Sequence, residues 1–152
     1  MKNFKRLSVI GFLSCLLGVA GCGKGNNPDE SSPVPNVAVN VSFNINNVGY
    51  TGLKTVGNVV YLSSVGYRGI MVYRLNSSGS QQLVAFDRTC TYNLSDNNGI
   101  VVAQNNLTAI CLECSSTYSL TNGSVLSGPS TLGLKEYTVN FNSTSGAVTI
   151  TN

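Results

Sequence analysis

The sequence predicts an all-β domain, folded as a small sandwich or barrel. Apolar and polar residues alternate in Val37–Ile45 and in Tyr137–Phe141, and a period of two is that of a half-buried strand. Between these segments, short β-branched or aromatic runs are separated by clusters of Gly, Asn and Ser, which are typical of turns. No amphipathic pattern of helical length is present, so we expect strands and turns throughout the folded part.

The first expected strand is the alternating segment Val37–Ile45. Further strands are expected, in chain order, at Val59–Leu62, Ile70–Leu75, Leu83–Phe86, Ile100–Ala103 and Leu107–Cys111. Residues 138–152 contain two strand-like stretches around Ser145-Gly146 and predict a C-terminal hairpin. From Val37 onward, roughly 115 residues support one hydrophobic core and one domain.

The N-terminus predicts export. A short cationic stretch, residues 2–6, precedes an apolar run over residues 7–20, which is the order found in secretory signal peptides. The run is shorter than the roughly 20 apolar residues that a permanent membrane-spanning helix needs. It ends in V-A-G-C at positions 19–22, which resembles the lipobox of bacterial lipoproteins and implies cleavage before Cys22 and lipidation of its thiol.

This resemblance divides the chain into three parts. Residues 1–21 are the expected lipoprotein signal peptide. Residues 22–36 are the expected lipidated Cys22 and a flexible linker, because the segment is polar, contains three prolines and has no apolar period. Residues 37–152 are the expected β domain. We therefore expect a protein of the bacterial cell envelope, anchored by lipid to the outer membrane on its periplasmic or surface side.

The charge of the chain belongs largely to the expected signal peptide. Three of the nine basic residues lie in it and all six acidic residues follow it, so the mature chain is close to neutral. A nucleic-acid-binding domain needs clustered Lys and Arg on its folded surface, and the sequence has no such cluster. The expected partners are a membrane, through the lipid, and an envelope redox or protein partner, but no nucleic acid.

Three cysteines remain in the expected domain once Cys15 and Cys22 are set aside. They are Cys90, Cys111 and Cys114. In the oxidising exterior of a bacterium such thiols pair, bind a metal or stay buried. Any chemistry of this chain is therefore expected to lie with them.

The sequence around these cysteines resembles the Rieske-type iron–sulfur domain, a small β fold in which two loops carry the motifs C-x-H and C-x-x-H. Cys90 and Cys111 stand at the two cysteine positions of that family, and Tyr92 and Cys114 stand at its two histidine positions. Further matches are Ser115 and Ser116 at a Gly-Ser pair, Tyr118 at an aromatic position, and Gly123, Gly128 and Pro129 in the stretch that covers the cluster.

The resemblance implies a Rieske-like β sandwich or barrel with two ligand-bearing loops and a [2Fe–2S] cofactor. A Rieske centre is held by two thiolates on one iron and two imidazoles on the other, and this chain contains no histidine. The His-ligated form is therefore excluded by composition. Tyr92 would bind iron only as a phenolate. This is unfavourable at neutral pH, because a tyrosine hydroxyl ordinarily has a pKa of about 10.

Three interpretations of the thiols stay open. The first is a disulfide, most simply one that joins the two loops through Cys90 and leaves the third thiol buried. The second is a metal, zinc or a cluster, held by the three cysteines with a fourth ligand from Asp87, Glu113, Tyr92 or water, because a C-x-x-C turn directs two thiolates at one ion. The third is a redox-active C-x-x-C dithiol, although such motifs usually begin a helix in a βαβ unit.

Enzymatic catalysis has little support in the sequence. Without histidine there is no Ser-His or Cys-His couple, and no Gly-rich phosphate-binding loop precedes a helix. Two functions of different class are expected instead. One is a metal-binding or iron–sulfur electron-transfer module of an envelope lipoprotein. The alternative is a cofactor-free structural or interaction module stabilised by a disulfide among Cys90, Cys111 and Cys114.

Overall fold

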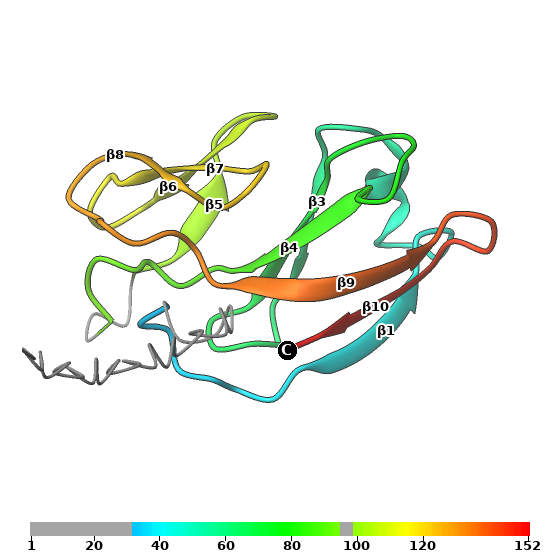
Figure 1. Cartoon of the computed structure of the whole chain (residues 1–152), viewed down its shortest axis with the longest axis horizontal. Coiled ribbons are helices and arrows are strands. Elements are labelled where there is room, and N and C mark those ends of the chain that lie inside the picture. Colours follow the sequence, from blue (N-terminus) through cyan, green and yellow to red (C-terminus); the bar gives the residue numbers. More distant parts are fainter. Residues whose placement is uncertain (1–31, 95–98) are drawn as a thin grey trace, which may run out of the picture.

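Two antiparallel β-sheets make up the part of the chain that the computed structural model describes, residues 32–94 and 99–152 (Figure 1). The larger sheet has six strands in the order β1-β10-β9-β4-β3-β2, and the smaller has four in the order β5-β6-β7-β8. Within these two ranges the helical structure is confined to one 3-10 turn, η1 (Thr51–Lys54). The all-β fold class predicted from the alternation of residues is confirmed.

Each segment predicted as a strand contains one. The larger sheet is formed by β1 (Asn40–Asn44), β2 (Val59–Leu62), β3 (Ile70–Arg74), β4 (Leu83–Asp87), β9 (Glu136–Asn142) and β10 (Ala147–Thr151). The smaller sheet is formed by β5 (Val101–Ala103), β6 (Thr108–Cys111), β7 (Thr117–Ser119) and β8 (Val125–Ser127). The predicted C-terminal hairpin is β9 and β10, which turn at Gly146 with a φ of +78°. Strands β7 and β8 were not predicted, because three residues of mixed polarity carry too little pattern.

Strands β3 and β4 are buried on both faces, and every one of their residues is buried. Because successive side chains of a strand point to opposite faces, these two strands separate two hydrophobic cores. Ile70 and Val72 pack inside the curled six-stranded sheet, whereas Met71 and Tyr73 pack toward the four-stranded sheet. The second core contains Cys90 and several residues of the smaller sheet, among them Cys111 and Tyr118.

The smaller sheet holds the two cysteine-bearing loops beside each other. The β4–β5 loop returns to β5 where the Val101 N–H donates to the carbonyl of Arg88, at 2.7 Å. Val101 then pairs with Cys111 on β6, and the Leu112 N–H donates to the carbonyl of Ile100, at 3.1 Å. The β4–β5 loop and the β6–β7 loop therefore leave neighbouring positions of one sheet.

The residues just before Val37 already contact the β domain. Val34 is buried, and the Lys135 ammonium donates a hydrogen bond to Asn36 Oδ1, at 2.9 Å. The predicted signal peptide and the predicted lipidation site, Cys22, lie outside the described residues. In the part of the chain that is described, no helix has the length and apolar character needed to span a membrane.

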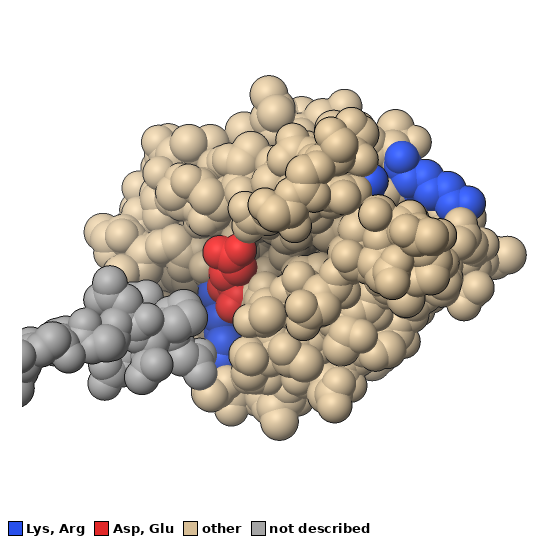
Figure 2. Space-filling model, turned by 45° about the vertical axis from the view of Figure 1, so that its right-hand side comes forward, with Lys and Arg blue, Asp and Glu red and all other residues tan. Residues whose placement is uncertain are grey.

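Charged side chains are sparse on the surface. On the face shown in Figure 2, Lys and Arg side chains occur in separate places and do not form a continuous basic patch. Charged residues make up only 10% of the chain.

Candidate functional site

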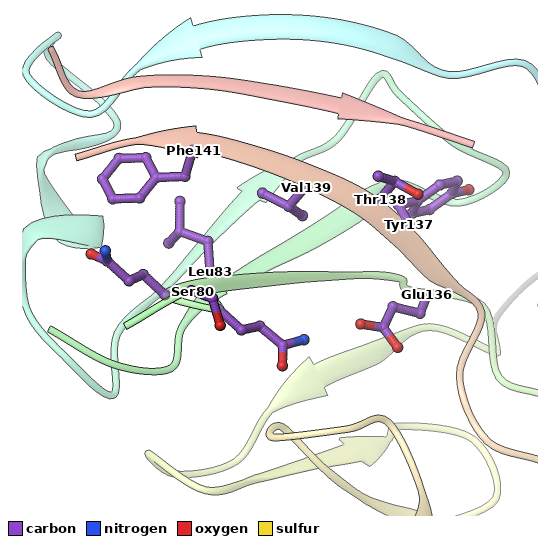
Figure 3. Close-up of a pocket in the computed structure, with 9 residues that line it drawn as sticks. Ser80, Leu83, Glu136, Tyr137, Thr138, Val139 and Phe141 are labelled. Carbon is purple, nitrogen blue, oxygen red and sulfur yellow. The ribbon is translucent and has the colours of Figure 1, made fainter. Parts of the chain in front are cut away.

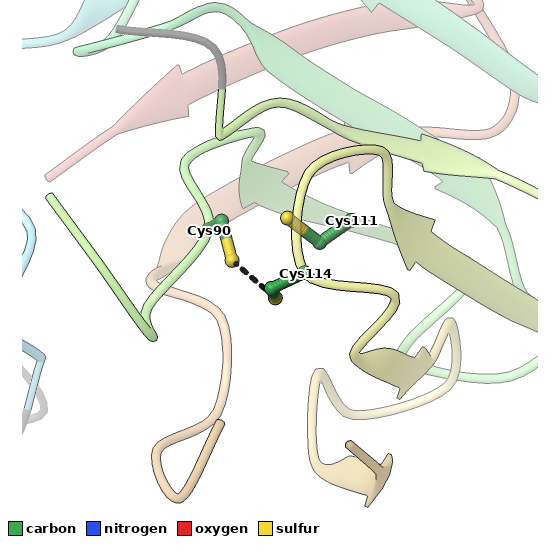
Figure 4. A group of neighbouring side chains, drawn as sticks. All are labelled: Cys90, Cys111 and Cys114. Carbon is green, nitrogen blue, oxygen red and sulfur yellow. Dashed lines mark hydrogen bonds between the residues drawn. The ribbon is translucent and has the colours of Figure 1, made fainter. Parts of the chain in front are cut away.

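The three domain cysteines meet at the end of the smaller sheet. Their sulfur atoms all lie within 4.8 Å of one another, and the Cys90 and Cys114 sulfurs are 3.3 Å apart (Figure 4). Cys90 and Cys111 are buried and Cys114 is partly exposed. All three are present as free thiols. The structure thus brings together the three cysteines that the sequence singled out.

Cys90 is fixed by the far end of its own loop. Its N–H donates to the carbonyl of Gly99, at 2.7 Å. The Arg68 guanidinium donates to the same carbonyl at 3.3 Å and to the carbonyl of Leu94 at 3.0 Å. A cation that binds two carbonyls of one loop holds that loop closed, and the Cys90 sulfur is held facing the second loop.

Cys111 and Cys114 are placed by a tight turn at the end of β6. The Cys111 N–H donates to the carbonyl of Ser116 at 2.8 Å, and the Ser115 N–H donates to the carbonyl of Cys111 at 3.0 Å. Ser115 has a φ of +59°, in the left-handed region that favours glycine. The tight turn therefore holds a residue with a side chain in a backbone conformation that glycine adopts without strain.

A group of hydroxyls surrounds the thiols. The Cys114 thiol donates to Ser116 Oγ at 3.1 Å, and that oxygen also accepts the Ser130 N–H at 3.0 Å. The Tyr118 hydroxyl lies 3.7 Å from the Cys90 sulfur and 3.2 Å from Thr91 Oγ1. Thr91 Oγ1 is in turn 2.6 Å from Ser130 Oγ. No sequence pattern points to Thr91 or Ser130, because isolated hydroxyl residues are common in a chain rich in Asn, Ser and Thr.

The environment separates the acidities of the two thiols of the C-x-x-C motif. Burial, together with a hydrogen bond to Cys90, raises the pKa of Cys111 to about 12. Burial also opposes ionisation of Cys114, but the hydrogen bonds that its sulfur can accept once ionised, from Ser116 and from the neighbouring thiols, outweigh that effect and hold its pKa below the ordinary value. Cys114 is therefore the thiol that ionises more readily.

The other proposed ligands lie elsewhere or at the edge of the site. Tyr92 is exposed, with 56% of its surface accessible. With Glu113, Cys90 and Cys114 it lines a cavity of about 360 Å³. The carboxylate of Asp87, another predicted candidate for the fourth ligand, is fully buried. It accepts hydrogen bonds from the Tyr67 N–H, the Thr89 N–H and the Tyr137 hydroxyl. Asp87 is therefore a structural residue.

The donor set does not fit a [2Fe–2S] centre. The Rieske form needs two imidazoles, and the chain has none. In any two-iron cluster, ligands on different irons are separated by the metals and their bridging sulfides, whereas these three sulfurs lie within 4.8 Å of one another. Two thiolates on a single tetrahedral ion, each about 2.3 Å from it, are roughly 3.8 Å apart. The group therefore matches the size of a site for one ion.

A second cavity lies on the larger sheet (Figure 3). It has a volume of about 310 Å³ and is lined by residues 80–83 and by one stretch of β9 that includes Glu136 and Phe141. Burial raises the pKa of Glu136. None of the three cysteines lines this cavity.

No protein-family model matches the sequence, and no curated protein matches it. Two of the solved structures that match align with most of the chain. The small subunit of an NADH-dependent nitrite reductase from Mycobacterium tuberculosis aligns over 77% of this chain and 97% of its own, with 16% identity and a TM-score of 0.45. A chain from a complex of the oxygenase and ferredoxin of carbazole 1,9a-dioxygenase aligns over 77% of this chain, with 20% identity and a TM-score of 0.47.

This chain spans only 29% of that second protein chain. At such identities and TM-scores the alignments assign no activity to the protein.

Proposed function

We propose that the chain is a lipid-anchored protein of the bacterial envelope whose Rieske-like β domain binds one thiophilic metal ion through Cys90, Cys111 and Cys114. The observation that carries the proposal is the approach of three sulfurs from two loops to within 4.8 Å of one another. The anchor rests on the lipobox-like residues 19–22 of the sequence.

The chemistry of the three thiols supports a soft divalent cation. Thiolates bind zinc and iron in preference to magnesium or calcium, which take oxygen ligands. Metal binding requires deprotonated thiols and releases their protons, and Cys114, with its lowered pKa, gives up its proton more readily than Cys111. Iron at this site would carry one electron to or from an envelope partner, whereas zinc would hold the two loops together.

Metal analysis of the full chain, purified in detergent without oxygen, tests the proposal. We expect about one equivalent of zinc or iron per chain, and we expect Cys90→Ser, Cys111→Ser and Cys114→Ser each to lose most of it. The conservative change Tyr92→Phe tests the fourth candidate ligand and is expected to retain the metal. A metal-free protein that also fails to take up added zinc or ferrous iron would refute the metal site.

The anchor is tested separately by mass spectrometry of the membrane-extracted protein. A chain that begins at an acylated Cys22 is expected. An intact Met1 with an unmodified Cys22 would refute the proposed lipid anchor. The proposed metal site would not be affected by that result.

A second candidate function is favoured by the separation of 3.3 Å between the Cys90 and Cys114 sulfurs. Their oxidation would give a cofactor-free interaction module with one disulfide between its loops. Such a disulfide joins the same two loops that the metal would join. The two candidate functions therefore differ in the chemistry of the link and share the same arrangement of the loops.

A further inference from the structure

The three sulfurs have one covered side and one open side. Cys111 has no accessible surface and Cys90 only 2%, and both belong to the second hydrophobic core. Cys90 and Cys114 also form part of the wall of the 360 Å³ cavity, together with Tyr92, Glu113 and Pro129. An ion held by the sulfurs is therefore screened by protein on the Cys111 side and faces the cavity on the other.

The described part of the chain places no fourth ligand of the usual kinds beside the sulfurs. No carboxylate oxygen joins the group of three, and histidine is absent from the chain. The Asp87 carboxylate is engaged by its own hydrogen bonds. Sites with three protein ligands and a fourth position open to solvent are typical of zinc centres whose fourth ligand exchanges.

From this arrangement we propose that the bound ion keeps an exchangeable coordination position that faces the cavity and accepts a neutral donor, either water or an imidazole-type nitrogen. The inference rests on the proposed metal site. It goes beyond that site because it assigns a ligand class to the cavity. A volume of about 360 Å³ lies within the range of small-molecule pockets, roughly 300–1,000 Å³, and accommodates an imidazole ring.

The charges around the site select a neutral donor over an anion. Three thiolates and a divalent ion carry one net negative charge, and Glu113 on the cavity wall adds another. The Arg68 guanidinium, which donates to the carbonyl of Gly99, supplies one positive charge in return. The total stays negative, so an anionic fourth ligand meets Coulomb repulsion that water or imidazole does not.

Substitution with Co²⁺ tests the inference on the full chain, because the visible bands of the ion report its ligands directly. We expect a thiolate-to-metal band at one equivalent of Co²⁺. Added imidazole is expected to shift the ligand-field bands in a saturable way, and azide is expected to bind at least about ten-fold more weakly. In Glu113→Gln, removal of one negative charge is expected to raise the affinity for azide relative to imidazole roughly five-fold.

The possible failures are distinguishable. Absence of the thiolate band refutes the metal site itself, and the inference with it. A thiolate band that neither imidazole nor azide alters means a closed site and overturns the inference alone. Azide that binds as tightly as imidazole overturns the preference for a neutral donor.

Discussion

The sulfur atoms of Cys90 and Cys114 lie 3.3 Å apart although 24 positions separate the two residues in the chain. This close pair connects the β4–β5 loop to the β6–β7 loop. The C-x-x-C motif alone suggests a local pair between Cys111 and Cys114, but Cys111 is fully buried and its pKa is raised to about 12. The tertiary structure, and not the sequence spacing, therefore decides which thiols are ready to react with each other.

Oxidation of the metal-free protein is expected to join Cys90 to Cys114. Thiol–disulfide exchange with oxidised glutathione would convert the two thiols to one disulfide and release two molecules of glutathione. Closing a loop of this length is expected to stabilise the domain by about 3 kcal/mol. Peptide mapping without reduction identifies the pair, and urea unfolding with and without reductant measures the gain.

Serine variants provide the controls for this pairing. Cys111→Ser is expected to keep the disulfide, whereas Cys90→Ser is expected to lose the bond between the loops. A wild-type protein in which Cys111 and Cys114 are found linked would contradict the expectation and restore the dithiol interpretation.

The sequence predicted the strands of the larger sheet because their pattern is local. Alternation in Val37–Ile45 and Tyr137–Phe141 marks half-buried strands; β1 lies within the first segment, and β9 contains the second. The continuous apolar runs that became β3 and β4 lack alternation because both of their faces are buried. The expectation that Cys90, Cys111 and Cys114 lie together came from a resemblance of motifs, and the structure brings their sulfurs together.

The rest of the site depends on contacts between distant residues. The hydroxyls of Thr91 and Ser130 are 39 positions apart and interact at 2.6 Å, and no local pattern encodes that distance. Asp87 lies just before Cys90 in the chain, and this position made its carboxylate a candidate metal ligand. Its structural role depends on the partners of its carboxylate, Tyr67 and Tyr137, which lie 20 and 50 positions away in the chain.

Asp87→Asn is expected to destabilise the domain by roughly 3 kcal/mol. Both carboxylate oxygens accept hydrogen bonds in a fully buried position, from the Tyr67 N–H and the Tyr137 hydroxyl on one side and from Thr89 on the other. In asparagine an amide NH₂ replaces one of the two carboxylate oxygens. This NH₂ would then face N–H or O–H donors that need an acceptor. Urea unfolding of the reduced protein measures the loss. Glu113→Gln, at an exposed position, is the matched control and is expected to change stability by less than about 0.5 kcal/mol.

Similar unfolding midpoints for the two variants would contradict the structural role of Asp87. The carboxylate would then be free to act in the site, and the assignment of Asp87 as a support of the loops would be wrong.

The stability of the reduced, metal-free protein is expected to fall between about pH 9 and pH 12. The pKa of Cys111 rises from 9.0 to about 12 in the folded state, chiefly through burial. Below pH 9 its thiol is protonated in both states. Above that pH the unfolded chain loses the proton first, so the folded state binds more protons and stability decreases as pH rises. Urea midpoints measured in steps across this range show the effect.

Cys111→Ala isolates this contribution from other groups that titrate in alkali. The variant is expected to be less stable at pH 8, because a buried sulfur is lost, but to have a flatter pH dependence above pH 9. Parallel curves for the two proteins would show that Cys111 does not keep its proton.

Gly128→Ala is expected to disrupt the support of Cys114 far more than Gly79→Ala, although both glycines have left-handed backbone conformations, with φ values of +99° and +95°. A Cβ at Gly79 meets nothing within 4 Å, so that variant bears only the backbone cost, about 1 kcal/mol. A Cβ at Gly128 would lie 2.5 Å from Ser116 Cα and 2.8 Å from Ser116 Oγ. The segment that contains Gly128 and Ser130 would have to move away from Ser116, and the hydrogen bond from the Ser130 N–H to Ser116 Oγ would be lost. The free energy of unfolding is expected to fall by about 3 kcal/mol or more. Urea unfolding and the rate of Cys114 alkylation report the two consequences, and equal effects of the two substitutions would show that Gly128 does not pack against Ser116.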